Sequence, residues 1–335
     1  MTKQIAIVGA GLSGCILANE LNKAGFQVTV YEKSRGTGGR LSSARVGEDS
    51  VDIGLPYFEN ISEPFDTWLR DLPCIVPWPT CVQSVEQNIS TQNYWVASPR
   101  FSALTRTLLS NVTLMTRCRI SHVWPDNLGV ILRDENGDCL DRFDAAVITT
   151  PAPQAVPLLE SIPRFAHKAE VIQPSANWIL IIGLSVHSKV TPDILLSSGP
   201  IKRAVRDSAK PGRHSKEYKE VWVVEASDEW SRSHIDTDAD SVSEHLLQAF
   251  EHMLDQKLTV AYTRSHRWLY AKHHTLQTSN PTETQQVSYL WSEHDKIAVC
   301  GDWILAGEAN LPPAEAAWQS ATQLARLLIE ELKGS

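Results

Sequence analysis

The chain has 335 residues, which is enough for one large or two medium domains with a sizeable apolar core. Its hydrophobic content of 42% and charged content of 21% are typical of a globular protein. The formal net charge of −8 argues against a nucleic-acid-binding surface. The longest apolar stretch, residues 178–186, is too short to span a bilayer, so we expect neither nucleic-acid nor membrane partners.

The first residues and the cysteines indicate the compartment. No apolar leader segment with a cleavage site precedes the first expected strand. The six cysteines are scattered and form no CxxC pair, which favours reduced thiols over a disulfide framework or a metal site. We therefore expect a cytoplasmic protein that holds no metal.

A glycine-rich turn joins the first expected strand, residues 5–8, to the first expected helix, residues 12–24. Gly9 permits a tight turn, Gly11 lets backbone approach a pyrophosphate, and Gly14 lets the helix pack close to the strand. The N-terminus of this helix would face the phosphates with N–H groups and a partial positive charge. The turn therefore predicts a dinucleotide-binding site.

An acidic residue ends the second expected strand, residues 28–31. Glu32 follows Gly14 at about the 20-residue spacing of such sites. A carboxylate there accepts hydrogen bonds from ribose hydroxyls and repels a 2′-phosphate, which argues against NADP in this slot. Lys33 and Arg35 weaken that exclusion a little.

The remaining elements follow from local patterns. Further strands are expected at residues 51–58, 112–123, 129–132, 143–150, 178–186, 220–226, 260–269 and 296–302. Helices are expected at residues 101–109, 241–257 and 313–332. Residues 72–80 are rich in proline and predict an irregular connection, whereas Asn136-Gly137 predicts a hairpin turn.

This order predicts a discontinuous first domain. Residues 1–60, 100–155 and 290–335 would form it, and residues 61–99 and 156–289 would form a second, inserted substrate domain. Ligands of doubly wound sheets bind beyond the carboxyl ends of the strands. The Gly301-Asp302 pair, at the end of the last expected strand, is therefore placed to meet a cofactor.

Several segments together resemble a known family. The glycine turn, Glu32, the run Arg35–Arg40, the strand before Pro151 and Gly301-Asp302 are similar to FAD-dependent oxidoreductases of the amine-oxidase superfamily. More narrowly, the chain resembles bacterial renalase-like proteins, in order from about residue 3 to residue 330. The segments that look similar include residues 32–40, 150–155, 230–232, 266–271 and 299–303.

The resemblance implies an α/β fold, with a Rossmann-type FAD-binding domain and an inserted α+β substrate domain, as in amine oxidases and p-hydroxybenzoate hydroxylase. It implies non-covalent FAD, because no family motif marks a covalent link. The implied cofactor residues are Gly9, Gly11, Leu12, Ser13, Gly14, Glu32, Lys33, Arg35, Gly38, Gly39, Arg40, Gly54, Ile120, Thr150, Asp302, Glu315 and Ala316. The implied substrate residues are Tyr57, His266, Arg267, Trp268 and Trp303.

The resemblance implies an oxidase of reduced nicotinamides, which takes hydride from dihydro-NAD(P) isomers and reduces O₂ to H₂O₂. No protein group is expected to act as acid or base, since the flavin carries the redox chemistry. Two alternatives stay open: an amine oxidase or desaturase-like enzyme acting on another small substrate, and a flavin-binding protein without turnover.

Some residues depart from the family pattern. The segment Gly54–Phe58 lacks a family amide, the link at residues 304–313 is longer, and Ala316 replaces a glycine. The run His266–Trp268 has two interpretations: Arg267 holds a substrate phosphate, or the run is an edge strand with a surface arginine and a core tryptophan.

Overall fold

The computed structural model describes every residue except 1, 60, 276–286, 307–310 and 334–335. The chain forms two compact units. The first unit comprises residues 1–39, 105–174 and 273–335, and the second comprises residues 40–104 and 175–272. Residues 40–60, which we expected in the first domain, thus lie in the second unit.

A six-stranded sheet of order β17-β18-β11-β1-β2-β7 forms the centre of the first unit. All its neighbours run parallel except β17, which pairs antiparallel with β18. Strands β1, β11 and β18 are almost entirely apolar and buried, as expected where both faces of a parallel sheet are covered. Their bounds are β1 Gln4–Val8, β2 Gln27–Glu32, β7 Thr113–Thr116, β11 Ala145–Ile148, β17 Tyr289–Ser292 and β18 Ile297–Cys300.

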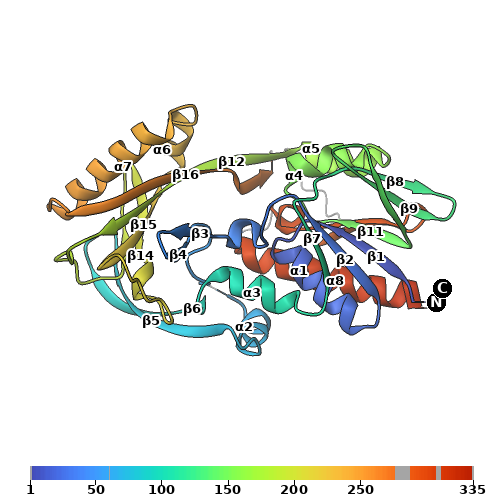
Figure 1. Cartoon of the computed structure of the whole chain (residues 1–335), viewed down its shortest axis with the longest axis horizontal. Helices are drawn as coiled ribbons and strands as arrows, with labels where there is room; N and C mark the ends of the chain where they lie inside the picture. The colour runs from blue at the N-terminus through green and yellow to red at the C-terminus, as the bar shows by residue number, and fades with distance from the viewer. Residues whose placement is uncertain (1, 60, 276–286, 307–310, 334–335) are drawn as a thin grey trace. The chain divides into compact units, whose positions relative to one another are not determined.

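Two helices from opposite ends of the chain pack together in this unit. They are α1 (Leu12–Lys23) and α8 (Pro313–Lys333), drawn in blue and red in Figure 1. The Ser13 hydroxyl of α1 donates a hydrogen bond to the Ala317 carbonyl of α8 at 3.2 Å. The last helix is therefore held beside the first turn of α1, where the sequence predicts the dinucleotide.

The first unit has a second layer. An antiparallel sheet of β8 (Ile120–Asp126), β9 (Gly129–Asp134) and β10 (Cys139–Phe143) shares one apolar core with the central sheet. Helices α4 (Ala152–Ala155) and α5 (Pro163–Glu170) contribute to the same core.

A seven-stranded sheet of order β16-β12-β15-β14-β13-β5-β6 forms the second unit. One face packs against α7 (Ala239–Leu254), and we call it the helix face. The other packs against the hairpin of β3 (Ser43–Val46) and β4 (Asp49–Asp52), and we call it the hairpin face. The strand bounds are β5 Ile75–Gln83, β6 Ile89–Ala97, β12 Ile172–Leu184, β13 Ile194–Leu196, β14 Ile201–Arg206, β15 Glu220–Ala226 and β16 Val260–Thr275.

Three further short helices lie in the described part of the chain. They are α2 (Glu63–Arg70), α3 (Phe101–Leu108) and α6 (Asp228–Ser233). No helix in the described ranges combines the length and apolar character needed to cross a membrane.

A buried ion network ties β4 to a loop of the second unit. The Lys210 ammonium lies 3.2 Å from an Asp52 oxygen and 2.6 Å from an Asp207 oxygen, and the Arg213 guanidinium contacts both carboxylates. All four side chains are at most 5% exposed. Asp52 also accepts a hydrogen bond from the Phe101 backbone N–H at the start of α3. Buried charges of this kind persist only when each one is paired.

The expected irregular segment at residues 72–80 is wrong, because β5 runs through it. Pro77 lies opposite Trp95 of β6. The Trp95 backbone exchanges its hydrogen bonds with Phe58, so it needs no N–H from Pro77. On the other edge of β5, β13 pairs with it at Val82 and Gln83, which lie beyond Pro77 and Pro79. Proline is tolerated in a strand where the ladder does not require its N–H.

Two other expectations also change, and one strand was missed. The single strand expected at residues 112–123 is two strands, β7 and β8, because Arg117 between them adopts a φ of 55°. The strand expected at residues 51–58 ends at Asp52. Strand β14, whose alternation is masked by its charged residues, was not predicted. The expected α/β class and the remaining long helices and strands are confirmed.

Candidate functional site

The three glycines of the turn in the first unit have different environments. Gly9 adopts a φ of 112°, and its N–H donates to the Tyr31 carbonyl at 2.8 Å. A Cβ on Gly14 would lie 2.1 Å from the Gly9 carbonyl oxygen, so only glycine fits there. A Cβ on Gly11 would meet no atom of the described residues within 4 Å. The space above Gly11 is therefore open to a ligand, whereas the space next to Gly14 is occupied by protein atoms.

Helix α1 begins at this open space. Gly11 is its N-cap residue and supplies no capping side chain, and the first turn contains no acidic residue. The first backbone N–H groups of a helix have no partner within the helix and carry a partial positive charge. An anionic group above Gly11 would satisfy these donors.

Glu32 is held next to the turn at the end of β2. It is 8% exposed, and its two oxygens accept hydrogen bonds from the Ala10 N–H at 3.0 Å and the Ser34 N–H at 2.8 Å. An ionised carboxylate has about four acceptor positions, so this one is held in place and keeps capacity for further donors such as ribose hydroxyls. Burial and the Glu32 charge raise the pKa of the Cys15 thiol, which excludes a reactive thiolate in α1.

A second glycine loop lies on the first. The Gly38 N–H donates to the Ala10 carbonyl at 2.9 Å, and a Cβ on Gly39 would lie 3.5 Å from the Gly11 Cα. Both glycines have positive φ, 123° and 52°. Lys33 donates to the Gln154 side chain at 2.8 Å, and Arg35 is exposed. The loop after β2 is thus folded back onto the turn.

Residues that follow β11 and β18 complete the candidate cofactor site of the first unit. The Thr149 hydroxyl donates to the Val8 and Gly9 carbonyls. The Thr150 Oγ1 atom is buried and has no hydrogen-bond partner in the described part of the chain. A buried hydroxyl without a partner is costly, and a bound ligand would supply one. The Trp303 indole N–H donates to the Thr150 carbonyl at 3.1 Å.

Four further implied cofactor residues, Ile120, Asp302, Glu315 and Ala316, are also buried in the first unit. Asp302 follows β18 and is 7% exposed, and Glu315 and Ala316 lie in the first turn of α8. Ile120 is buried at the start of β8, two positions after Cys118, whose N–H donates to the Glu32 carbonyl. In the link at residues 304–313, residues 307–310 lie outside the described part of the chain.

Arg40, Gly54 and Tyr57 lie in the second unit. A Cβ on Gly54 would be 1.9 Å from the Arg40 carbonyl oxygen, which fixes the two backbones against each other. The Arg40 guanidinium donates to the Ala271 carbonyl at 3.5 Å. Tyr57 is 3% exposed and stacks on Tyr94, with ring centroids 4.2 Å apart.

The run His266–Trp268 is divided between two faces of the sheet. Trp268 packs on the hairpin face, donates to the Ile53 carbonyl at 2.7 Å and has its ring centroid 4.7 Å from that of His266. The Nε2 atom of His266 is buried without a partner in the described residues, and burial lowers the pKa of its imidazole. Arg267 points the other way: its guanidinium contacts the Ile235 carbonyl and lies over the Trp178 ring of the helix-face core. These contacts are those that the packing interpretation of Arg267 expects.

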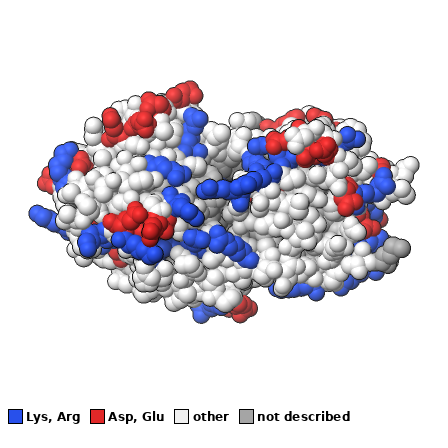
Figure 2. Space-filling model, viewed as in Figure 1, with Lys and Arg blue, Asp and Glu red and all other residues white. Residues whose placement is uncertain are grey.

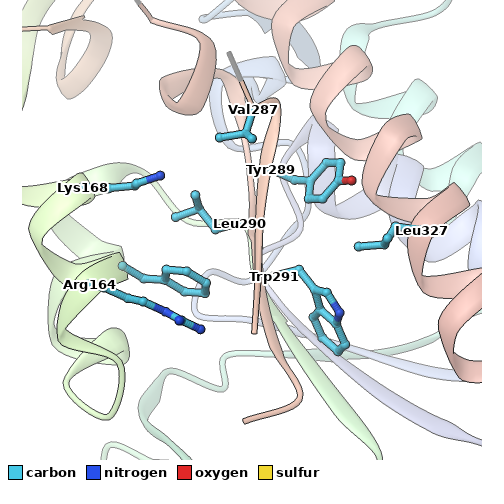
Figure 3. A pocket seen from close by; sticks show the side chains of 8 residues that line it. Arg164, Lys168, Val287, Tyr289, Leu290, Trp291 and Leu327 are labelled. Carbon is cyan, nitrogen blue, oxygen red and sulfur yellow. The ribbon is translucent and has the colours of Figure 1, made fainter. Parts of the chain in front are cut away.

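One concavity lies on the first unit beside β17. Its volume is about 460 Å³. Figure 3 shows Arg164 and Lys168 of α5 on one side of β17, and Tyr289 and Trp291 pointing toward α8 on the other. Its lining includes none of the cofactor or substrate residues that the resemblance implies.

Sequence reasoning missed a charged group on the hairpin face. Lys202 and Arg203 of β14 both contact Glu225 of β15. Only the pairing of these strands reveals the group, because neither strand carries a motif. On the face shown in Figure 2, Lys and Arg side chains border small acidic groups over the second unit.

Comparisons with known proteins agree with this geometry. Residues 7–72 match the family model described as "NAD(P)-binding Rossmann-like domain". The chain is 24% identical over 235 residues to the flavin-containing monooxygenase ustF1 of Aspergillus flavus. The match covers 63% of this chain but only 54% of the monooxygenase, so the chain spans about half the length of that relative.

Two solved structures share the fold. An oxidoreductase from Methanosarcina mazei has a TM-score of 0.68 at 13% identity and covers 96% of this chain and 100% of its own. A redesigned putrescine oxidase has a TM-score of 0.69 at 10% identity, with 98% and 99% coverage. The chain thus has a Rossmann-like dinucleotide-binding domain within a two-part α/β fold that known oxidoreductases also have.

Proposed function

We propose that this chain is an FAD-dependent oxidoreductase. The observation that carries the proposal is the open space above Gly11, at the uncapped N-terminus of α1 and within reach of the loop that holds Glu32. The buried Thr150 hydroxyl, which has no partner in the described residues, supports it. The flavin-containing monooxygenase relative supports flavin over a nicotinamide as the resident cofactor.

The residues fit a flavin dinucleotide. Gly9–Gly14 and the first N–H groups of α1 would hold the pyrophosphate, and Glu32 would accept from the adenosine ribose. The backbone at Ile120 would meet the adenine, and Asp302 would bind the ribitol chain. We also propose Arg40 and Gly54 as cofactor residues. No covalent link is needed in this arrangement.

The more specific proposal is a renalase-like oxidase of reduced nicotinamides. Bound FAD would accept hydride from a dihydro-NAD(P) isomer and pass the electrons to O₂, giving H₂O₂. The protein would orient the substrate and exclude water from it. We propose Tyr57, Trp268 and Trp303 as residues of the substrate site, and His266 supplies a buried ring nitrogen whose pKa is lowered by burial.

We also propose a cytoplasmic location. It rests on cysteine chemistry, since none of the six cysteines, all within the described ranges, forms a disulfide.

The first experiment is the visible spectrum of the purified protein before and after acid precipitation. We expect a flavin spectrum in the protein and a yellow supernatant afterwards, which establishes non-covalent flavin. A colourless protein that also fails to take up added FAD would overturn the proposal, and flavin retained in the pellet would overturn the non-covalent part.

The second experiment identifies the electron donor. The flavin-loaded protein is mixed under nitrogen with dihydronicotinamide isomers or with small amines, and bleaching is followed. Bleaching by the isomers supports the specific proposal. Bleaching by amines alone replaces it with an amine oxidase, and bleaching by dithionite alone replaces it with a flavin-binding protein without turnover.

A further inference from the structure

A β-bulge in β14 brings two consecutive basic side chains to one carboxylate. Ile201 lies opposite Ala226 of β15, and Arg203 lies opposite Glu225, so Lys202 is the extra residue of the bulge. In a regular strand Lys202 and Arg203 would point to opposite faces. Instead, the Lys202 ammonium lies 3.3 Å and the Arg203 Nε 2.5 Å from Glu225 oxygens. Bulges of this kind re-aim side chains and are common beside active sites.

Lys272 of β16 brings a third cation to the same place. Its ammonium lies 2.6 Å from both carboxylate oxygens of Asp228, the first residue of α6. Burial opposes the charge of Glu225, but the three cations outweigh it and hold the Glu225 pKa below its usual range. Glu225 is therefore paired directly with Lys202 and Arg203, while Lys272 pairs with Asp228 and Arg203 also lies 3.8 Å from a Glu59 oxygen.

The cations also repel one another. Burial lowers the pKa of the Lys202 ammonium, Glu225 partly offsets this, and the charges of Arg203 and Lys272 lower it further. Such a group gains stability from an added negative charge. The Lys202 side chain is 40% exposed and that of Lys272 is 28% exposed, so both ammonium groups are open to a solute.

We propose that Lys202 and Lys272 form a subsite for an anionic group of the substrate, either a phosphate or a carboxylate. Each ammonium carries three N–H donors, whereas the pairs above use one donor of Lys202, to Glu225, and two of Lys272, to Asp228. The inference rests on the proposed function, because it concerns the substrate of the same enzyme.

The position of the subsite indicates what the anion is attached to. The Arg203 guanidinium, which shares Glu225 with Lys202, lies 5.5 Å from the ring centroid of Tyr57. Tyr94, which is partly exposed, stacks on the buried Tyr57 beside it. An anion site next to aromatic surface suits a planar substrate that carries a phosphate or carboxylate, and it disfavours a simple amine.

The test uses the flavin-loaded protein, with inorganic phosphate and acetate as separate probes in isothermal titrations. We expect saturable binding, weakened about tenfold by Lys202→Met or Lys272→Met, because each change removes a charge-assisted hydrogen bond. Lys272→Arg should retain binding. Tighter binding of phosphate than acetate assigns a phosphate-bearing substrate, and the reverse assigns a carboxylate. Lys216→Met is the matched control, since Lys216 pairs with Glu48 on an exposed surface of the same unit.

A substitution that is expected to strengthen anion binding separates a binding role of Lys272 from a structural one. Asp228→Asn removes the acid that competes for Lys272, so anion binding should tighten. Three results would each overturn the subsite: no binding to the unmodified protein, equal binding after both lysine substitutions, or binding that releases the flavin.

The subsite and the proposed function can fail independently. If the purified protein holds no flavin, the same titration is done on it as purified. Phosphate binding that depends on Lys202 and Lys272 would then support the subsite while the flavin proposal fails. Circular dichroism and thermal unfolding of each variant show that weakened binding is not caused by misfolding.

Discussion

The glycine turn of the first unit and the hairpin face of the second unit are built in different ways. The turn uses backbone groups from a short stretch of chain, Gly9–Gly14, and one acid, Glu32, that reaches back to it. The hairpin face uses side chains from β14, β15 and β16, which are far apart in the sequence. Local sequence therefore encodes the first site, whereas strand register and a bulge create the second.

The largest effect is expected where the second unit depends on paired side chains. Asp52→Ala would leave the Lys210 and Arg213 charges buried with one carboxylate fewer, and it should lower the free energy of unfolding by about 3–5 kcal/mol. Denaturant unfolding measures this change. Glu48→Ala, which breaks the exposed pair with Lys216, should have little effect. Equal losses in both variants would show that the buried network is not special.

In the first unit we expect a smaller loss of stability, caused by a clash with the backbone at Gly9. Gly14→Ala places a Cβ 2.1 Å from the Gly9 carbonyl oxygen, so α1 must shift. We expect the protein to lose about 1–3 kcal/mol of stability, the usual range for overpacking, together with flavin binding. Thermal unfolding and the flavin-to-protein absorbance ratio report the two losses. Unchanged stability would contradict the close contact.

Gly11→Ala is the matched change within the same turn. Among the residues that the structure describes, a Cβ there meets no atom within 4 Å, so stability without flavin should be unchanged. The methyl group would occupy the space assigned to the pyrophosphate, and we expect flavin affinity to fall by about tenfold or more. Titration of the flavin-free protein with FAD measures this affinity. Full flavin affinity in this variant would remove the observation that carries the proposed function.

The smallest effect concerns the pH dependence of the hairpin face. Burial raises the pKa of Tyr57 to about 12, while the nearby Arg203 charge lowers it in part. Because this folded-state pKa exceeds the unfolded value of about 10, the contribution to stability is complete below pH 10 and is lost as the pH rises toward 12.

Ultraviolet titration of tyrosinate compares the unmodified protein with Tyr57→Phe. The difference between the two curves should contain one tyrosine that ionises near pH 12. If the tyrosine that is lost in Tyr57→Phe ionises near pH 10 instead, Tyr57 is not enclosed.

Much of the first site could be predicted because its signal is local. The spacing of Gly9, Gly11 and Gly14 reflects backbone geometry within one turn, and Glu32 needs only the next strand to reach it. Thr149 was missed there, because a threonine at the end of a strand has no distinctive pattern. Its hydroxyl contacts the Gly9 carbonyl only after β11 pairs with β1.

The second site could not be predicted in the same way. Arg267 and Trp268 are neighbours in sequence, but strand alternation places them on opposite faces of the sheet. Pro77 predicts a break, and β5 accommodates it because the ladder there requires no N–H from it. In both cases the outcome depended on a partner strand.

The sequence by itself determined the α/β class, the glycine turn and its acid, and the apolar strands around them, because these depend on residues close together in the chain. Tertiary structure decided which cations gather around Glu225 and which residues face the hairpin. Those contacts depend on strand register, and in β14 the insertion of the single residue Lys202 changed which side chains share a face.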